Sequence, residues 1–403
     1  MVANMTALET SNSPKRRRLM AEDNTVVSSF QQRLQAQIPP PPVFPTSTSA
    51  LDTSHTYIFG KLPFSVDWEV SRIAHHNSLE IEQFGRVMHS LQENIQNPET
   101  LWKILQACAL EIKQEMDALL GDFELATTPG FRMPPKSSNM VWETLEKDEG
   151  WYSGRVHLGL AFSSIGAKLT LTPHPMRISS SRRAYRKFGA DRFLNISIGK
   201  EFIRAENTSA TEKIAAFLKQ PLTICGREYR LFFLRKKESE TYSAHYFATH
   251  GAGLEGREIS LAGLYEWLIS LKMNRGTAAP KLWSRISLSL SSTTATLVFS
   301  PEQIRLVRDV SSETGECMTD GCAKASPAVF KTLWKSSILA LEETPTAVQA
   351  RIGGAKGVWY IDPLSDPASD DIWIEIRESQ LKYKYESTIF EDPTLRTLVS
   401  HDV

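Results

Sequence analysis

The chain has 403 residues, enough for two or three domains, and its 41% of hydrophobic residues can form a buried core. The 46 Lys and Arg residues equal the 46 Asp and Glu residues, which excludes a polycation that holds nucleic acid by net charge but allows local basic patches. No apolar run approaches the roughly 18–20 residues that span a bilayer, and no signal-peptide core precedes the first domain, so neither membrane nor secreted proteins are indicated. The four cysteines favour reduced thiols in cytosol or nucleus.

Residues 1–55 are predicted to form a disordered tail. They are rich in Ser, Thr, Gln and Pro, and too poor in aromatic residues to offset the entropic cost of ordering. The basic run from Pro14 to Arg18 is either a nuclear-import signal or a solvated patch, and the sequence favours neither. We therefore expect the protein in the nucleus, in the cytoplasm or in both.

Residues 56–135 are predicted to be helical, because apolar residues recur at steps of three and four. One stripe covers residues 81–95, and a second, which begins after an Asn-Pro pair, covers residues 98–121. Both stripes are typical of core packing. His75 and His76 have no cysteine or carboxylate at ligand spacing, so we interpret them as helix-surface histidines.

Residues 136–300 are predicted to form a mixed domain in which strands dominate. A loop over residues 127–140 marks its start, and the apolar period then changes to two. Strands are predicted at residues 156–161, 169–173, 286–290 (Ile286, Leu288 and Leu290 alternating with serines) and 295–299. A helix is predicted at residues 260–273 between these strands.

Residues 301–403 alternate between helix and strand patterns. Ser326-Pro327 begins a short helix with an apolar side. Strands are predicted at residues 348–352, 358–361, 372–376 and 381–385. In the last of these, Leu381, Tyr383 and Tyr385 would face one way and Lys382 the other.

Three motifs are interpreted as ordinary structure. Gly251–Gly256 matches G-x-G-x-x-G, but the preceding residues 241–250 are too polar for a parallel strand and no acid for the ribose follows, so we expect a loop. Cys317 and Cys322 have no second cysteine pair and are expected to be free thiols. The acidic stretch 362–371 lacks the ligand pattern of a calcium loop, so the sequence assigns no metal ligands.

Two basic clusters are candidates for nucleic-acid contact, because guanidinium groups suit phosphates and aromatic rings suit unpaired bases. The first consists of Arg177, Arg182, Arg183, Arg186, Lys187 and Arg192, interleaved with Tyr185, Phe188 and Phe193. The second consists of Arg227, Arg230, Arg235, Lys236 and Lys237, which flank Phe232 and Phe233. The alternative is that the aromatic residues belong to the core and the arginines only solubilise strand edges.

The stretch Gln349–Pro363 carries three glycines around Lys356, and it also contains Arg351. Glycines allow the backbone to approach a polyanion while an ammonium reaches it as a point charge. The stretch is not a P-loop, because no Ser or Thr follows the lysine. Lys382 is a second cation for the same anion, although a glycine-rich hairpin without a ligand remains an alternative.

An ordered series of motifs resembles the eukaryotic RNA-dependent RNA polymerases of gene silencing, especially fungal members. Met318–Pro327 looks like the family's TDG-x-G-x-IS, Thr344–Arg351 like PSAFQIR, Gly353–Gly357 like GG-x-KG and Arg377–Tyr383 like RPS-x-x-KF. Upstream, Leu171–Pro173, Arg186–Leu194 and Lys281–Ser291 are similar to the family's TP, RkFG-x-dRFL and K-x-x-R-x-x-LxLS elements.

The resemblance implies an α+β fold: a helical N-terminal region, a slab-like β-rich middle and, over residues 301–403, an incomplete first double-psi β-barrel. It implies nucleotidyl transfer on a single-stranded RNA template, with ribonucleoside triphosphates as substrates, in RNA silencing and the production of small interfering RNA. Mg²⁺ ions held by an Asp-x-Asp-Gly-Asp loop serve family members, and Lys356 and Lys382 match lysines that approach nucleotide phosphates. Together with the first basic cluster, this makes Arg177, Arg182, Arg183, Arg186, Lys187, Arg192 and Arg351 the candidates for RNA binding.

The sequence also departs from the family pattern. Ala323 and Glu378 replace a glycine and a proline of the motifs, and no Asp-x-Asp-Gly-Asp occurs within the 403 residues. We therefore expect an N-terminal portion that binds RNA, binds no catalytic metal and does not polymerise alone. The alternative is a non-enzymatic scaffold that binds RNA or other silencing proteins.

Overall fold

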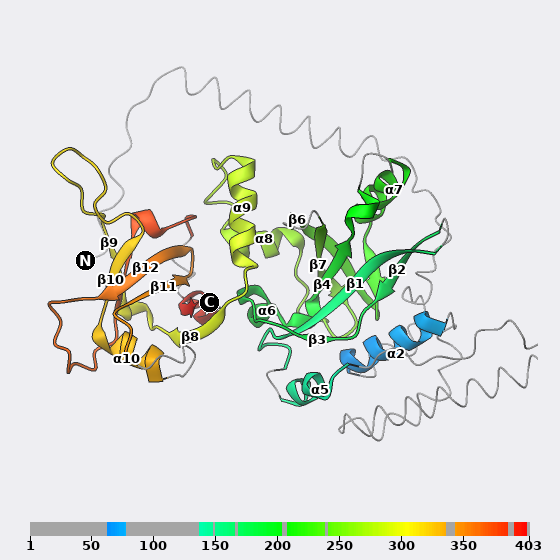
Figure 1. Ribbon diagram of the computed structural model, residues 1–403, viewed down its shortest axis with the longest axis horizontal. Coiled ribbons are helices and arrows are strands. Elements are labelled where there is room, and N and C mark those ends of the chain that lie inside the picture. The colour runs from blue at the N-terminus through cyan, green and yellow to red at the C-terminus, as the bar shows by residue number, and fades with distance from the viewer. Residues whose placement is uncertain are drawn as a thin grey trace, which may run out of the picture. The chain divides into compact units, whose positions relative to one another are not determined.

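The computed structural model describes residues 63–77, 137–147, 150–165, 168–203, 208–237, 241–335, 343–385 and 391–400 (Figure 1). The chain divides into a unit of residues 1–46 and a unit of residues 47–403, and all described residues belong to the second unit. The predictions for the tail, its basic run and the helices at 81–95 and 98–121 lie outside the described residues. Among the described helices, none combines the length and apolar character of a membrane span.

The first sheet has seven strands in the order β2-β1-β4-β7-β6-β5, with β3 paired to β1 (Figure 1). Its strands are β1 (Val156–Ile165), β2 (Lys168–Pro173), β3 (Arg177–Ile178), β4 (Phe193–Ile198), β5 (Leu222–Ile224), β6 (Arg227–Lys236) and β7 (Tyr242–Gly251). β1 and β4 run parallel, and the remaining pairs are antiparallel.

Alternating side chains give this sheet two different faces. On β4, Leu194, Ile196 and Ile198 enter one apolar cluster, whereas Phe193 enters another. The first cluster also takes residues of α2 (Phe64–Asn77), α5 (Asn139–Glu146) and α7 (Thr208–Leu218). The second takes residues of α6 (Arg183–Phe188), α8 (Leu261–Ile269) and α9 (Ala279–Ser289). Helices therefore pack on both faces of the sheet.

The second sheet has seven strands in the order β8-β14-β11-β12-β10-β13-β9 (Figure 1). They are β8 (Thr294–Val298), β9 (Ile304–Val307), β10 (Cys322–Ala325), β11 (Ala347–Ile352), β12 (Ala355–Ile361), β13 (Ile374–Arg377) and β14 (Thr397–Ser400). A third apolar cluster joins this sheet to α10 (Pro327–Lys335), with Phe330 and Trp359 fully buried. Short 3-10 helices complete the fold: η2 (Ala190–Arg192), η3 (Lys200–Phe202), η5 (Pro301–Gln303), η6 (Glu378–Gln380) and η8 (Pro393–Leu395).

Most predicted elements are confirmed, namely the strands β1, β2, β8, β11, β12 and β13 and the helices α8 and α10. Gly251 ends β7, which is antiparallel to both of its neighbours, and residues 252–256 form a loop after it. Cys317 and Cys322 are free thiols, and the acidic stretch 362–371 lies in the loop between β12 and β13. The proposed division at residues 135 and 300 stays a prediction, although β8 before residue 300 already pairs within the second sheet.

The predicted strand at residues 286–290 is wrong, because residues 286–289 form the end of α9 and Leu290 is its C-cap. Leu282, Ile286 and Leu290 are spaced by four residues and all pack into the second apolar cluster, which is a helical pattern. The alternation of leucine with serine matched a strand equally well over so short a window. Pro280 near the start of α9 was the helix signal that the prediction did not use.

The predicted strand at residues 381–385 is also wrong. After η6 the chain forms only an isolated bridge between Leu381 and Ala355. Leu381 packs against the third cluster, whereas Tyr383 and Tyr385 pack with the second. The three residues therefore do not share one face.

Candidate functional site: a cationic cleft

The β11–β12 hairpin places Arg351 beside Lys356. Its register leaves only Gly353 and Gly354 in the turn, and Gly353 has φ +53°, which glycine adopts without steric cost. The same register pairs Arg351 directly with Lys356, and opposed residues project from the same face of a sheet. Two cations therefore share one side of this hairpin.

The glycines of the hairpin are explained by close packing of the chain. A Cβ on Gly357 would overlap the carbonyl oxygen of Gly321, and a Cβ on Gly354 would lie 2.9 Å from the carbonyl oxygen of Tyr383. The sequence-based interpretation assigned these glycines to a bound polyanion. The structure gives them the role of bringing the hairpin against Gly321 and Tyr383, and contact with a polyanion stays a prediction.

Lys382 reaches the hairpin from the C-terminal side of η6. Its backbone N–H donates to the carbonyl oxygen of Gly354 at 2.9 Å, and its Nζ donates to the carbonyl oxygen of Ser379 at 2.9 Å. The backbone contact ties Lys382 to the glycine turn. The side-chain contact fixes the ammonium through Ser379.

Asp309, which the sequence analysis missed, holds Ser379 in place. Its carboxylate accepts hydrogen bonds from the Ser379 Oγ at 2.7 Å, the Ser379 N–H at 2.8 Å and the Thr319 Oγ1 at 2.9 Å. Partial burial raises the pKa of Asp309, but hydrogen bonds from Ser379 and Thr319 outweigh it and lower the pKa below its ordinary value. Ser379 Oγ in turn accepts from the Gly321 N–H at 3.0 Å. One carboxylate therefore joins the segment around Thr319 to the segment that carries Lys382.

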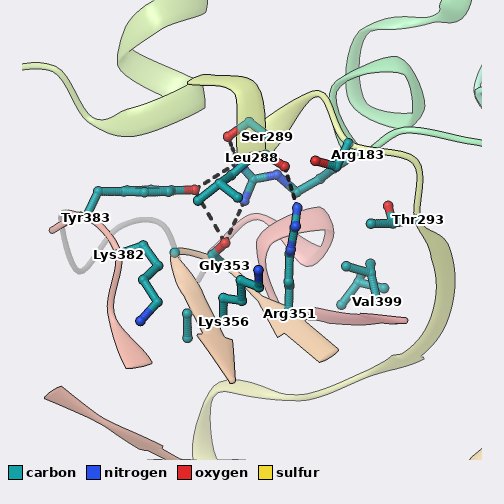
Figure 2. A pocket seen from close by; sticks show the side chains of 14 residues that line it. Arg183, Leu288, Ser289, Thr293, Arg351, Gly353, Lys356, Lys382, Tyr383 and Val399 are labelled. Carbon is teal, nitrogen blue, oxygen red and sulfur yellow. Dashed lines mark hydrogen bonds between the residues drawn. The ribbon is translucent and has the colours of Figure 1, made fainter. Parts of the chain in front are cut away.

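Arg183, Arg351, Lys356 and Lys382 line one cleft (Figure 2). The cleft encloses about 430 Å³, part of it open to solvent. Its other walls come from the end of α9, the segment that follows α9, the glycine turn and β14. No carboxylate occurs among the lining residues, so the cleft is a cationic site in which anions are favoured.

Arg183 forms the floor of the cleft and is 7% exposed. Its guanidinium donates to the carbonyl oxygen of Gly353 at 3.0 Å, the hydroxyl of Tyr383 at 3.0 Å and the Oγ of Ser289 at 3.3 Å (Figure 2). It also lies over the ring of Trp267, 4.7 Å from the centroid. All of these partners are neutral, so the positive charge of Arg183 is not cancelled by the fold.

Arg351 and Lys356 add to this charge. Arg351 donates to the carbonyl oxygen of Leu288 at 2.7 Å, while its Nε is buried without a partner among the described residues. Burial, and then the nearby charge of Arg183, lowers the pKa of Arg351. Lys356 has no hydrogen bond or ion pair within the part of the chain that the structure describes. Its ammonium is therefore available to a ligand.

Comparison with known proteins identifies the family. A family model described as RNA dependent RNA polymerase matches residues 167–398, which is more than half of the chain. The chain belongs to the RNA-dependent RNA polymerase family. The sequence-based recognition of this family is thereby confirmed.

Individual members of the polymerase family match over part of their length. The RNA-dependent RNA polymerase QDE-1 from Thielavia terrestris has 26% sequence identity and a TM-score of 0.64, and the match covers 85% of this chain and 36% of QDE-1. It confirms the predicted α+β fold class with the start of a double-psi β-barrel. The rice (Oryza sativa subsp. japonica) protein named "Probable RNA-dependent RNA polymerase 1" is 26% identical over 226 residues, 51% of this chain and 28% of the rice protein.

The RNA-dependent RNA polymerase 2 of Arabidopsis thaliana is 21% identical over 211 residues, which are 52% of this chain and 17% of the Arabidopsis protein. The chain thus spans less than a third of the length of the curated relatives that it matches.

Members of the polymerase family typically use metal ions, but the side chains that line this cleft are not suited to bind them. Its charged lining consists of two arginines and two lysines, which repel cations. Within the described residues, no group of three or more His, Cys, Asp or Glu side chains is arranged to hold a metal ion. The cleft of this family member therefore suits an anionic ligand.

Several of the arginines predicted for RNA binding are held by the fold. Arg192 is 4% exposed, and its guanidinium donates to the carbonyl oxygens of Ala248 at 2.9 and 3.1 Å and of Arg257 at 2.9 Å. It also lies over the ring of Phe247, 4.6 Å from the centroid. Arg227, from the second basic cluster, forms an ion pair with Asp191 at 2.8 Å.

Arg186 and Lys187 also have partners within the protein. Arg186 donates to the carbonyl oxygen of Thr293 at 3.0 Å, and burial followed by the charge of Arg183 lowers its pKa to about 10. Lys187 forms an ion pair with Asp392 at 2.7 Å. RNA contact by any of these residues stays a prediction.

The aromatic residues of the two basic clusters belong to the core. Tyr185 stacks on Phe193 with centroids 4.2 Å apart, and both rings are 2% exposed. Phe232 and Phe233 are equally buried. The alternative interpretation, in which these rings are core residues, therefore holds, and none of these four rings is open to a base.

Arg177 and Arg182 differ from the other arginines of the first cluster. Arg177 is exposed, and Arg182 is partly exposed at the residue before α6. Both lie near the first sheet rather than in the cleft lining, whereas Arg183 and Arg351 line the cleft. The structure therefore splits the predicted RNA-binding residues among three environments.

Proposed function

We propose that this chain serves RNA-directed RNA synthesis in RNA silencing, and that its cleft binds the phosphates of a ribonucleoside triphosphate. The observation that carries the proposal is the convergence of four cations, without a carboxylate, on one cleft in a member of the polymerase family. A polyphosphate offers several charges to such a site, and each charge-assisted hydrogen bond is stronger than a neutral one.

The residues of the cleft have distinct roles in this proposal. Lys356, which has no partner in the described part of the chain, meets the phosphate chain directly. Lys382 is held by Ser379 and adds a second ammonium at a fixed place. Arg183 and Arg351 are tied to carbonyl oxygens, so they contribute a constant positive potential beneath the ligand.

We propose that the 403-residue polypeptide binds nucleotide and RNA without polymerising RNA by itself. Two observations support this: the sequence contains no Asp-x-Asp-Gly-Asp, and the cleft contains no carboxylate for a cation. A primer-independent synthesis assay with the four ribonucleotides, Mg²⁺ and a single-stranded template tests it. No product above background is expected, and sustained synthesis by the purified polypeptide would disprove it.

Binding of a ribonucleoside triphosphate tests the role of the cleft. The variant with both Lys356→Gln and Lys382→Gln should bind ATP at least about tenfold more weakly than the native chain, since each change removes a charge-assisted contact. Lys335→Gln, on the exposed end of α10, is the matched control and should bind like the native chain. Equal affinity of the double variant and the control would remove the cleft from the proposal.

A non-enzymatic scaffold for silencing proteins, in the nucleus or the cytoplasm, is the second candidate, but no feature of the cleft favours it. Salt dependence separates the two candidates, because single-stranded RNA held by n phosphate contacts loses affinity with a logarithmic slope of about −0.7n. A protein-binding scaffold would show weak RNA binding at every salt concentration.

A further inference from the structure

One face of the first sheet brings together residues that the sequence separates widely. The register pairs Gly159 on β1 with Asn195 on β4, and Asn195 with His245 on β7. It also pairs Ser243 on β7 with Arg235 on β6. Directly paired residues share a face, so these side chains form one polar row across the sheet. Further along the same strands, this face packs against α6, α8 and α9.

Basic residues from both sequence clusters surround this row. Arg177 lies over β1, with its guanidinium 3.5 Å from the place where a Cβ on Gly159 would stand. A Cβ at position 159 would make an ordinary van der Waals contact with Arg177, so this side chain lies against the sheet at Gly159. Arg235 and Lys237 extend from the end of β6, and both are exposed. Neither side chain has an ion pair or hydrogen bond within the described residues.

Two buried nitrogen atoms in and beside the row have no hydrogen-bond partner among the described residues. His245 is 7% exposed, and its Nδ1 has no hydrogen-bond partner among the described residues. Burial, and then the charges of Arg182, Lys237 and Arg235, lowers its pKa to about 3. The Nε of Arg182 is also buried without a partner. Buried polar atoms of this kind are rare in structural cores.

Trp283 of α9 stands at the edge of the same face. Its ring is 44% exposed and stacks on Phe233 with centroids 4.7 Å apart and planes at 29°. Its Nε1 donates to the carbonyl oxygen of Leu234 at 3.2 Å, which fixes the ring orientation. Phe233 in turn lies 5.8 Å from His245, so Trp283 is continuous with the polar row. One side of an oriented indole ring therefore remains open to a second planar group.

We propose that this basic face, made of Arg177, Arg182, Arg235, Lys237 and Trp283, binds single-stranded RNA. The cations contact phosphates, and the open side of Trp283 stacks against an unpaired base, which is the combination that single-stranded RNA requires. The site is separate from the cleft, but Arg182 and Arg183 are consecutive and serve one site each. The proposal rests on the proposed function only in naming RNA as the ligand.

Fluorescence anisotropy of a labelled, unstructured 12-nucleotide RNA tests the basic face over a series of salt concentrations, with the full 403-residue chain. The double variant Arg235→Gln with Lys237→Gln should make the salt slope shallower by about 1.4, because two phosphate contacts are lost. Lys213→Gln with Lys219→Gln is the matched control. These two exposed lysines lie on and just after α7, whose Ile214 and Leu218 pack on the opposite face, and their loss should leave the slope unchanged.

Trp283 is tested by two substitutions at the same position. Trp283→Leu keeps apolar packing on Phe233 but removes the indole, so RNA affinity should fall about fivefold or more at an unchanged salt slope. Trp283→Phe keeps a ring and should restore most of the affinity. Unfolding midpoints in urea show whether each variant remains folded.

An unchanged slope in the Arg235/Lys237 variant, together with unchanged affinity in Trp283→Leu, would overturn the proposal. Absence of RNA binding by the native chain would also overturn it, and would point to a protein ligand for this face. These outcomes are independent of the cleft, because ATP binding and the Lys356 and Lys382 variants report on the cleft alone.

Discussion

The cleft and the interior of the first sheet differ in whether a basic side chain is left without a partner. In the sheet, the donors of Arg192 are filled by carbonyl oxygens and its guanidinium is packed against Phe247. In the cleft, Lys356 has no partner within the described residues, and the nearby arginines have only neutral ones. A sequence cluster of basic residues therefore does not define a binding site. Lys356 lines the cleft without a partner among the described residues, whereas the guanidinium groups of Arg183 and Arg192 both donate to neutral oxygens of the fold.

The largest expected effect is on the structural side of this comparison. Arg192→Leu removes three charge-assisted hydrogen bonds and leaves buried carbonyl oxygens without donors, so the free energy of unfolding should fall by about 3 kcal/mol or more. Urea denaturation measures it. Arg230→Leu is the matched control, because that side chain is 51% exposed and should cost less than about 1 kcal/mol. Equal losses in the two variants would mean that Arg192 is not a structural residue.

Acid should destabilise the same sheet through two histidines. Burial, followed by the charge of Arg182, lowers the pKa of His157 to about 4 and that of His245 to about 3, against an ordinary value of 6.5. Below pH 6.5 both histidines become protonated in the unfolded chain but stay neutral in the folded chain. The free energy of unfolding therefore falls as the pH drops from 6.5 toward 4. The slope is at most about 1.4 kcal/mol per pH unit for each histidine.

Urea midpoints between pH 7 and pH 5 measure this slope. The double variant His157→Asn with His245→Asn should have a shallower slope of stability against pH. His250→Asn, at a side chain that is 55% exposed, should leave the slope unchanged. An equally steep slope in the double variant His157→Asn with His245→Asn would contradict the assignment.

A smaller effect is expected at Asp309, which acts on the cleft through Ser379. Asp309→Asn should lower the free energy of unfolding by about 1–2 kcal/mol and weaken ATP binding about threefold to tenfold. Because the folded pKa lies below the ordinary value of 3.8, the native carboxylate stabilises the fold above that pH and loses this contribution only as the pH falls through the folded pKa.

The difference in stability between the native chain and the Asp309 variant should therefore be constant from pH 5 to pH 8. Asp370→Asn, at an exposed position in the β12–β13 loop, is the control and should change neither stability nor ATP affinity. A stability loss without any loss of ATP affinity would reduce Asp309 to a purely structural residue.

The sequence predicted local patterns well where one periodicity dominated. Alternation identified β1 and β2, and a helical stripe identified α10. The prediction from alternation was wrong at Ile286, Leu288 and Leu290. Over so short a window these residues fit both the two-residue period of a strand and the four-residue spacing of a helix. The strand prediction around Lys382 was wrong as well, because a 3-10 turn followed by a single bridge can show the same apolar alternation as a strand.

The cleft was predictable only in part. Lys356 was found from the glycines around it and Lys382 from its place in the following alternating stretch, both also match family motifs, and the structure places both at one cleft. Asp309 and the floor position of Arg183 were not predictable, because each acts through contacts between segments far apart in the chain. The spacing of residues along the chain does not predict such long-range contacts. The same reason explains why the basic face emerged only when two sequence clusters were seen on one sheet.

The most direct test of the account measures the affinity of inorganic tripolyphosphate, which offers phosphates without a base or sugar, by calorimetric titration. The native chain should bind it, and Lys356→Gln should bind about tenfold more weakly while its urea midpoint stays equal or rises slightly, because the like-charged neighbour of Arg351 is removed. If Lys356→Gln lowers the urea midpoint but leaves the affinity for tripolyphosphate unchanged, Lys356 is a structural cation and the cleft does not handle phosphate.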